Sequence, residues 1–366
     1  MTIINIMWSS GSPFSSVHKV HQQIVSQLDP AIEIKTWFLQ GEVNGCTEPV
    51  KDVHEWRFSS RLLKERHVWR LLKPWMQARL RKAMIQSGAK VVLLDGLGVA
   101  RVMLPILRQM PDIRAVVVFH GATRLREEHL ALFRTFPAER LTLAAVSQTL
   151  ALALQEKLHL PVQGLRSALH PETFRARLLE RKQARRVFDL PQNGGRVLGA
   201  VGRLVADKGF DYLLDAFARS LAKHPDISLV IIGEGPDRSA LERKIKHLGL
   251  GGKVFLPGHK PGLAKLYLGF DWVVIPSREE GLGLVLQEAV IAGVPVLVSD
   301  LPVFREQLGG AGHYVPVGNV EAWIAALDEV AGEDGATVAS SQHQALAPEQ
   351  AWQRFCEDSR TLLSIH

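Results

Sequence analysis

Two carboxylates stand eight positions apart, Glu280 and Glu288, with a glycine-containing turn between them. The apolar run at 271–275 is typical of a buried parallel strand, and a helical pattern follows the turn and ends at Gly293. A strand, a glycine turn and a helix N-terminus make a phosphate-binding geometry, because unpaired backbone N–H groups and the helix dipole point at the anion. The two carboxylates could then accept hydrogen bonds from groups on either side of a diphosphate, as ribose and sugar hydroxyls would provide.

This arrangement resembles the E-x7-E motif of retaining glycosyltransferases with the GT-B fold, specifically family 4. Other segments of the second half resemble motifs of the same family in the same order: Val201–Leu204 with Asp207–Phe210, Ile231–Asp237, Val254–Gly258 and Pro295–Ser299. Together these segments cover roughly residues 196–331, about a third of the chain. Each segment alone is a weak signal, but five in the family's order are a specific one.

The resemblance implies roles for the residues of these motifs. Arg203 and Lys208 would stabilise the negative charge that a diphosphate leaving group develops as the glycosidic bond breaks. Glu288 would bind the ribose diol and Glu280 the hydroxyls of the donor sugar. The remaining donor-binding residues are Gly202, Gly281, Leu282, Gly283 and Leu284, of which the last four would offer backbone N–H groups to the phosphates.

The chain contains no Asp-x-Asp sequence. We therefore expect a mechanism without a metal, in which Arg203 and Lys208 take the role of a divalent ion. No metal ligand and no cofactor is expected, and the nucleotide-diphosphate sugar serves as a co-substrate.

Two candidate sites lie in the first half. His120 ends the apolar run at 115–119, where family 4 members often carry a histidine, and the resemblance implies that it positions the sugar or the acceptor. No carboxylate beside it suggests a nucleophile, so the family's front-face substitution is expected, with the leaving phosphate oxygen taking the acceptor proton. Relatives have two adjacent glycines after the first strand. This chain has only Gly11, which we consider with Ser10 and Ser12 as a contact to the donor phosphates or the acceptor.

Short apolar runs of strand type alternate with longer helical patterns along the whole chain. The strand-type runs lie at 3–8, 32–38, 91–95, 115–120, 143–147 and 161–165, and again at 196–202, 229–233, 254–257, 272–276 and 296–299. Such alternation predicts βαβ units, and two series predict an α/β protein with two Rossmann-like, doubly wound parallel-sheet domains. Because ligands bind at the carboxyl ends of parallel strands, we expect the two domains to face each other across a cleft, as in the GT-B fold.

We expect an N-terminal acceptor-binding domain at 1–167 and a C-terminal nucleotide-sugar donor domain at 168–347. The basic and then turn-rich run at 181–195 is read as the break between the two series of strands. The final helical pattern at 348–366 is placed back on the N-terminal domain by resemblance.

Charge is unevenly distributed along the 366 residues, whose net charge is +7. Residues 1–190 contain 28 Lys and Arg against 16 Asp and Glu, or +12, and the remainder contains 16 against 21, or −5. A basic half suits a nucleic acid, an anionic membrane or a phosphorylated acceptor. A nucleic acid is disfavoured, because the basic residues lack interleaved stacking aromatics and a known module.

The stretch from Arg57 to Met84 contains nine Lys and Arg against one acid, Glu65. With Trp69 and Trp75 at its border, it could lie as a basic amphipathic helix at an anionic bilayer interface. It could equally bind a phosphorylated acceptor, or pack on the sheet as an ordinary helix with a solvated basic face.

The two cysteines, Cys46 and Cys356, have no metal-ligand spacing and are typical of a reduced cytosolic protein. The N-terminus lacks the basic and apolar regions of a signal peptide, and no run approaches the ~18 apolar residues of a membrane span. We expect a cytoplasmic protein, acting in solution or at the inner face of the cytoplasmic membrane.

These observations predict a retaining glycosyltransferase that moves a sugar from a nucleotide-diphosphate sugar to a glycan or glycolipid, as in bacterial lipopolysaccharide core or other cell-surface polysaccharide biosynthesis. Two alternatives stay open. A GT-B-like sugar-nucleotide epimerase would need an acid/base pair around the second carbon of the sugar and no acceptor groove. A donor-binding protein without turnover is favoured only by the single Gly11, whereas the intact Arg203, Lys208, Glu280 and Glu288 argue against it.

Overall fold

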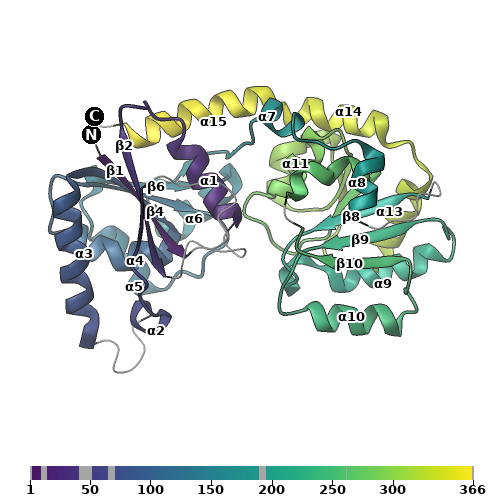
Figure 1. The fold of residues 1–366 in the computed structure, drawn as a ribbon, viewed down its shortest axis with the longest axis horizontal. Helices are drawn as coiled ribbons and strands as arrows, with labels where there is room; N and C mark the ends of the chain where they lie inside the picture. Colours follow the sequence, from purple (N-terminus) through teal and green to yellow (C-terminus); the bar gives the residue numbers. More distant parts are fainter. Residues whose placement is uncertain are drawn as a thin grey trace. The chain divides into compact units, whose positions relative to one another are not determined.

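The computed structural model describes residues 2–9, 15–40, 52–64, 71–188, 195–260 and 262–364. The chain divides into two compact units: unit 1 comprises Met1–Ser167 with Gln353–His366, and unit 2 comprises Ala168–Trp352. Each unit contains one parallel β-sheet accompanied by helices (Figure 1). The two sheets confirm the expected α/β class with two Rossmann-like, doubly wound domains.

Unit 1 is built on a seven-stranded sheet with the order β3-β2-β1-β4-β5-β6-β7, and every strand pair is parallel. Its strands are β1 (Thr2–Ser9), β2 (Glu33–Gln40), β3 (Val53–Glu55), β4 (Ala89–Asp95), β5 (Arg114–Phe119), β6 (Leu141–Ala145) and β7 (Gln163–Gly164). Its helices are α1 (Ser15–Val25), α2 (Ser60–Leu63), α3 (Lys73–Ser87), α4 (Gly96–Leu107), α5 (Glu127–Arg134), η3 (Ala138–Arg140) and α6 (Gln148–Leu158). The chain winds outward from β1 to β3 and then resumes at β4, so β1 and β4 form the switch point of this sheet.

Unit 2 is built on a six-stranded parallel sheet with the order β10-β9-β8-β11-β12-β13. Its strands are β8 (Val197–Val201), β9 (Ser228–Ile232), β10 (Val254–Gly258), β11 (Trp272–Ile275), β12 (Val296–Ser299) and β13 (His313–Val315). Its helices are α7 (Pro171–Arg175), α8 (Arg181–Val187), η4 (Ala206–Lys208), α9 (Phe210–Leu221), α10 (Arg238–His247), η5 (Leu263–Gly269), α11 (Leu284–Ile291), α12 (Pro302–Leu308), η6 (Gly309–Ala311), α13 (Val320–Gly332) and α14 (Gly335–Leu346). By the same winding rule, its switch point lies between β8 and β11.

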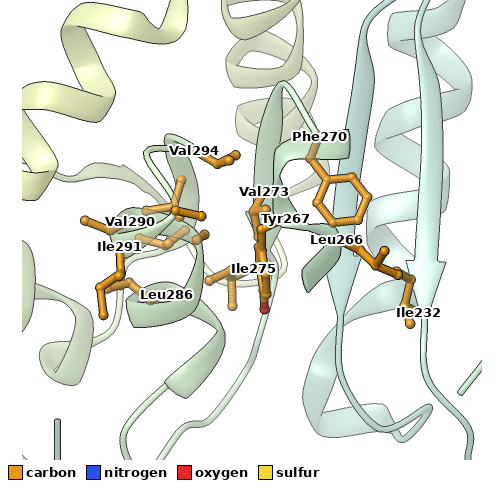
Figure 2. Close-up of a cluster of buried hydrophobic side chains, with 14 of the residues drawn as sticks. Ile232, Leu266, Tyr267, Phe270, Val273, Ile275, Leu286, Val290, Ile291 and Val294 are labelled. Atoms are coloured by element: carbon orange, nitrogen blue, oxygen red, sulfur yellow. The ribbon is translucent and has the colours of Figure 1, made fainter. Parts of the chain in front are cut away.

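The sheet of unit 2 is buried on both faces. Along β11, Val273 and Ile275 belong to one hydrophobic cluster, whereas Trp272 and Val274 belong to another. This alternation follows from the two-residue period of a strand, and burial of both faces explains why the strand reads as a continuous apolar run. Figure 2 shows the first cluster, to which α11 contributes Leu286. Its packing fixes the helix that carries the second carboxylate of the motif.

The basic run at 181–195 lies between β7 and β8, the last strand of unit 1 and the first of unit 2, but its first part is helix α8 of unit 2, so the two units divide earlier, after Ser167. The guanidinium of Arg185 donates to the carbonyl oxygen of Gly269 over 3.1 Å and to the carboxylate of Asp271 over 2.7 Å. The same carboxylate accepts the backbone N–H of Val197 at the start of β8, also over 2.7 Å. These contacts tie α8 to the sheet of unit 2, so its basic residues are structural there.

The C-terminal helix α15 (Pro348–Leu363) was expected to belong to the first domain over its whole length. The division between the units instead falls inside the helix, after Trp352. Its first turns are held on unit 2, where Glu349 forms an ion pair of 2.8 Å with Arg175 and the ring of Trp352 contacts His170.

Candidate functional site

The two segments that carry the predicted donor-binding residues follow neighbouring strands of unit 2. Strands β8 and β11 pair in parallel through Leu198 with Trp272 and Gly199 with Val273. Their carboxyl ends therefore lie at the same edge of the sheet, at the switch point, where open α/β sheets bind ligands. The segments at 202–209 and 276–284 leave the sheet at this edge.

The structure joins two of the predicted catalytic residues directly. The ammonium of Lys208, at the end of η4, donates to Oε1 of Glu280 in a salt bridge. The buried hydroxyl of Ser277 donates to the same oxygen over 2.9 Å. The side chains of Lys208 and Glu280 are 23% and 14% exposed, so both are held and both can be reached from solvent. An ammonium has three donors, and the bond to Glu280 leaves the cation able to bind an anionic oxygen as well.

A backbone hydrogen bond and a side-chain ion pair hold the two segments together. The backbone N–H of Arg278 donates to the carbonyl oxygen of Asp207 over 2.7 Å, and its guanidinium forms a two-bond ion pair with Asp211 at 2.8 and 2.9 Å. Gly209 has a φ of +68°, and a Cβ atom there would lie 2.0 Å from the carbonyl oxygen of Pro276. Only glycine permits this approach, which brings Lys208 to Glu280.

Gly202 and Arg203, the other residues predicted after β8, differ in whether their donors are already used within the protein. The N–H of Gly202 donates to the carbonyl oxygen of Ile232 over 3.0 Å, so this donor is used within the sheet. Arg203 is exposed, and no carboxylate in the described ranges pairs with its guanidinium. Arg203 is therefore placed at the predicted edge but outside the Lys208–Glu280 contact.

The glycine turn leads into α11 as predicted. Gly283 is the N-cap residue with a φ of +82°, and as a glycine it has no side chain to cap the helix. A Cβ atom at Gly283 would lie 2.5 Å from the ring of Phe304, so glycine is also required by packing. Leu282 is buried, whereas Gly281 and Leu284 are partly exposed. The backbone N–H groups of a helix start suit an anion.

Glu288 lies in the interior of unit 2 rather than at its surface. Glu288 is 6% exposed, and its carboxylate accepts a hydrogen bond of 2.6 Å from the hydroxyl of Tyr267. Tyr267 is fully buried in the first hydrophobic cluster (Figure 2). Burial, together with the negative charge of Glu288, raises the pKa of Tyr267 well above its ordinary value. Tyr267 therefore remains a neutral donor that orients the carboxylate. The sequence pattern did not indicate Tyr267 or Ser277 as supporting residues.

In unit 1, His120 follows the last residue of β5, at the carboxyl edge of the sheet. Its Nε2 atom lies 3.0 Å from Nε2 of His21 in α1 and 3.9 Å from Oδ1 of Asp95, which ends β4. The backbone N–H of Trp8 donates to Oδ2 of Asp95 over 3.2 Å. Burial raises the pKa of Asp95 to about 6 and lowers that of His120 to about 3. Neutral imidazoles therefore lie at this edge beside a carboxyl group that ionises near pH 6. Gly11, with Ser10 and Ser12, lies outside the described residues.

The basic stretch from Arg57 to Met84 is described except for residues 65–70, and its longest described helix is α3. The buried side chains of α3 are Met76, Leu80 and Met84. Near its start, apolar side chains face solvent instead: Leu71 is 81%, Leu72 43% and Trp75 51% exposed. The guanidinium of Arg79 lies 4.9 Å from the centroid of the Trp75 ring. No helix in the described ranges has both the length and the apolar character to cross a bilayer.

Comparison with known proteins gives a consistent match for unit 2. Residues 181–344 match the family of glycosyl transferases group 1. The alpha-D-kanosaminyltransferase of Streptomyces kanamyceticus is 28% identical over 267 residues, covering 66% of this chain and 68% of that protein. The lipopolysaccharide core biosynthesis mannosyltransferase LpsB of Rhizobium meliloti is 30% identical over 123 residues, covering 32% of this chain and 35% of that protein.

A solved structure extends the likeness to the whole chain. HepE of Anabaena, in complex with UDP and glucose, superimposes with a TM-score of 0.77 at 18% identity, covering 99% of this chain and 97% of that chain. At this identity the likeness shows the fold, which is the GT-B fold expected from the sequence. The chain spans 15% to 35% of the length of the first curated relatives that it matches.

Proposed function

We propose that this protein is a retaining, metal-independent glycosyltransferase of the family 4 type, which transfers a sugar from a nucleotide-diphosphate sugar to a glycan or glycolipid. The observation that carries the proposal is the contact between Lys208 and Glu280 at the switch point of unit 2, beside the glycine N-cap of α11. The match of residues 181–344 to glycosyl transferases group 1 covers all of these residues. The solved relative HepE, which binds UDP and glucose, has the same fold.

The donor would lie with its diphosphate at this edge of unit 2. Lys208 and the N–H groups that precede α11 would bind the phosphate oxygens, and Arg203 would add a second cation from the turn after β8. Glu280 would accept hydrogen bonds from sugar hydroxyls, and Glu288, oriented by Tyr267, from the ribose diol.

In the transfer step, the bond between the anomeric carbon and the diphosphate oxygen breaks. The acceptor oxygen forms its bond to that carbon on the same face, and its proton passes to the leaving phosphate oxygen. Negative charge on the diphosphate grows during this step, so a cation fixed beforehand stabilises the transition state more than the ground state. Lys208 has this property because Glu280 and the close approach at Gly209 hold it in place.

The proposed acceptor is a membrane-associated glycan, with bacterial lipopolysaccharide core as the specific candidate and the cytoplasmic face of the membrane as the location. The exposed Leu71, Leu72 and Trp75 lie at the start of α3, and the helix itself carries Lys73, Arg79, Arg81 and Lys82 without an acid. Apolar side chains beside cations suit an anionic lipid surface. The likeness to LpsB, named for lipopolysaccharide core biosynthesis, points to the same class of acceptor.

A nucleotide-binding experiment tests the donor site. The melting temperature of the full chain would be measured with UDP, GDP, ADP, dTDP and CMP, for wild type, Glu288→Gln and the exposed control Glu329→Gln. A diphosphate at 100 times its dissociation constant adds about 2.7 kcal/mol of stability, which raises the melting temperature by roughly 5–10 °C. We expect one diphosphate to stabilise wild type and Glu329→Gln but not Glu288→Gln. A folded wild type that no nucleotide stabilises would overturn the donor site.

A further inference from the structure

A chain of hydrogen bonds runs through three side chains of unit 1, from β1 through α1 to the end of β5. His21 places its Nδ1 atom 2.7 Å from Oδ1 of Asn5 and its Nε2 atom 3.0 Å from Nε2 of His120. Asn5 is 2% exposed and His21 is fully buried, whereas His120 is 13% exposed. Only His120 of the three can therefore meet a ligand, and the other two lie behind it.

The atom that faces each ring nitrogen indicates where the protons lie. A carbonyl oxygen such as Oδ1 of Asn5 can only accept, so the proton of His21 is on Nδ1 and its Nε2 carries a lone pair. The contact of 3.0 Å between the two Nε2 atoms then requires a proton on Nε2 of His120. A neutral imidazole has one proton, so Nδ1 of His120 carries a lone pair.

Both rings are neutral, as this arrangement requires. Burial lowers the pKa of His21 well below its ordinary value, with a further lowering from His120 and His18. Burial likewise lowers the pKa of His120 to about 3. A second proton would give either ring a positive charge in a buried place, and on His21 it would occupy Nε2, the atom that accepts from His120.

A metal ion is the competing explanation for two imidazoles and a carboxylate in one place, since His21, His120 and Asp95 could offer one ligand atom each. Two nitrogen ligands of a tetrahedral zinc ion, with bonds of about 2.0–2.1 Å, lie about 3.3 Å apart. The two Nε2 atoms are closer, at 3.0 Å, and Oδ1 of Asp95 is 3.9 Å from His120. The distances therefore fit a hydrogen bond between the two rings better than a shared metal.

We infer that Asn5 and His21 are positioning residues that hold His120 as the Nε2–H tautomer and leave its Nδ1 as a hydrogen-bond acceptor. Under the proposed function, on which this role rests, His120 then binds a hydroxyl that donates, from the sugar or the acceptor. The tautomer itself does not depend on the proposed function. It can therefore be tested without any substrate.

The test is a long-range ¹H–¹⁵N correlation spectrum of the full chain labelled with ¹⁵N in its histidines, recorded at pH 7. His120→Gln and His21→Gln assign the signals by their loss. We expect His21 protonated on Nδ1 and His120 protonated on Nε2. In Asn5→Leu, an apolar replacement of similar size, we expect His21 to populate both tautomers. His247→Gln is the control, because His247 is exposed in α10 of unit 2 and does not belong to this network.

Turnover gives the second readout. We expect Asn5→Leu to lower kcat roughly 10- to 100-fold while KM for the donor changes little, and His247→Gln to leave both unchanged. The opposite tautomer of His120, or an unchanged His21 tautomer in Asn5→Leu, would overturn the inference. Stoichiometric zinc binding that is lost in His21→Gln would replace it with a metal site. If the tautomers are as stated but no nucleotide stabilises the protein, the proposed function fails and the positioning network stands.

Discussion

The carboxyl edges of the two sheets share a topology and differ in chemistry. Both sheets reverse their winding between neighbouring central strands, β1 and β4 in unit 1 and β8 and β11 in unit 2. The edge of unit 2 carries a salt bridge, Lys208 with Glu280. The edge of unit 1 carries neutral imidazoles and a buried carboxyl group, Asp95, whose pKa is raised to about 6. One winding pattern thus supplies an edge suited to an anion and another suited to hydroxyl groups.

The largest expected effect comes from removing the positive charge of Lys208 in unit 2. Lys208→Gln should lower kcat about 10²- to 10³-fold, because a fixed positive group that stabilises a developing anion is worth about 2.7–4 kcal/mol. Lys223→Gln is the matched control, since Lys223 pairs with Asp328 at the surface over 2.6 Å. Steady-state kinetics should show less than a twofold change for Lys223→Gln. Equal losses in the two variants would mean that the contact in unit 2 has no special role.

The second predicted effect is a pH dependence of stability that comes from the edge of unit 1. The pKa of Asp95 in the folded protein, about 6, lies above its ordinary value of 3.8, so the folded state holds this proton more tightly. Stability from this group is therefore present below about pH 4 and is lost as the pH rises through about 6. At pH 7 the loss is at most about 3 kcal/mol, from 1.36 kcal/mol per unit of pKa.

Urea unfolding at pH 4.5 and pH 7 tests this behaviour. Asp95→Asn should gain stability relative to wild type as the pH rises, because the amide has no proton to lose. The lowered pKa values of His21 and His120 act in the opposite direction, but they are common to both proteins. Parallel pH curves for the two proteins would show that Asp95 titrates as an ordinary surface carboxyl group.

The close approach of the two segments in unit 2 predicts a smaller effect on stability. Gly209→Ala introduces a Cβ atom 2.0 Å from the carbonyl oxygen of Pro276, whereas Gly249→Ala meets nothing within 4 Å. The two glycines have φ values of +68° and +67°, so the cost of the backbone conformation is shared. Gly209→Ala should be less stable than Gly249→Ala by about 1–3 kcal/mol in urea unfolding. Equal stabilities would mean that the segments can separate freely.

The smallest predicted effect concerns the apolar side chains at the start of α3. Leu71→Ser should weaken binding to vesicles containing phosphatidylserine about tenfold, or about 1.4 kcal/mol, which is somewhat less than the roughly 1.5–3 kcal/mol for full burial of a leucine. Leu152→Ser in α6 is the matched control, since Leu152 is 57% exposed and lies outside the basic stretch. Co-sedimentation with the vesicles gives the comparison. Identical binding by both variants would remove the membrane contact from unit 1.

The donor side of the site could be predicted from sequence because its signals are local. A strand, a turn and a helix start lie within the segment at 276–291, and Lys208 follows β8 by the same rule. Position along the chain therefore fixed their place at the sheet edge. The pairing of Lys208 with Glu280 could not be foreseen, because it depends on how two separate segments approach each other.

The network in unit 1 could not be predicted, because its contacts are distant in sequence. His21 lies 16 positions from Asn5 and 99 from His120, and no periodic pattern marks these residues. Asp95 was within reach of prediction, since it ends an expected strand as His120 does. The short edge strands β3 (Val53–Glu55) and β13 (His313–Val315) were missed for a different reason: three residues are too few to show a period.

Hydrogen–deuterium exchange with and without the stabilising nucleoside diphosphate tests the difference between the two edges most directly. We predict slower exchange at 202–209 and 276–288 of unit 2 in wild type, and little change at either segment in Lys208→Gln. Protection confined to the edge of unit 1 around Asp95 and His120, with none at the two segments of unit 2, would contradict this prediction.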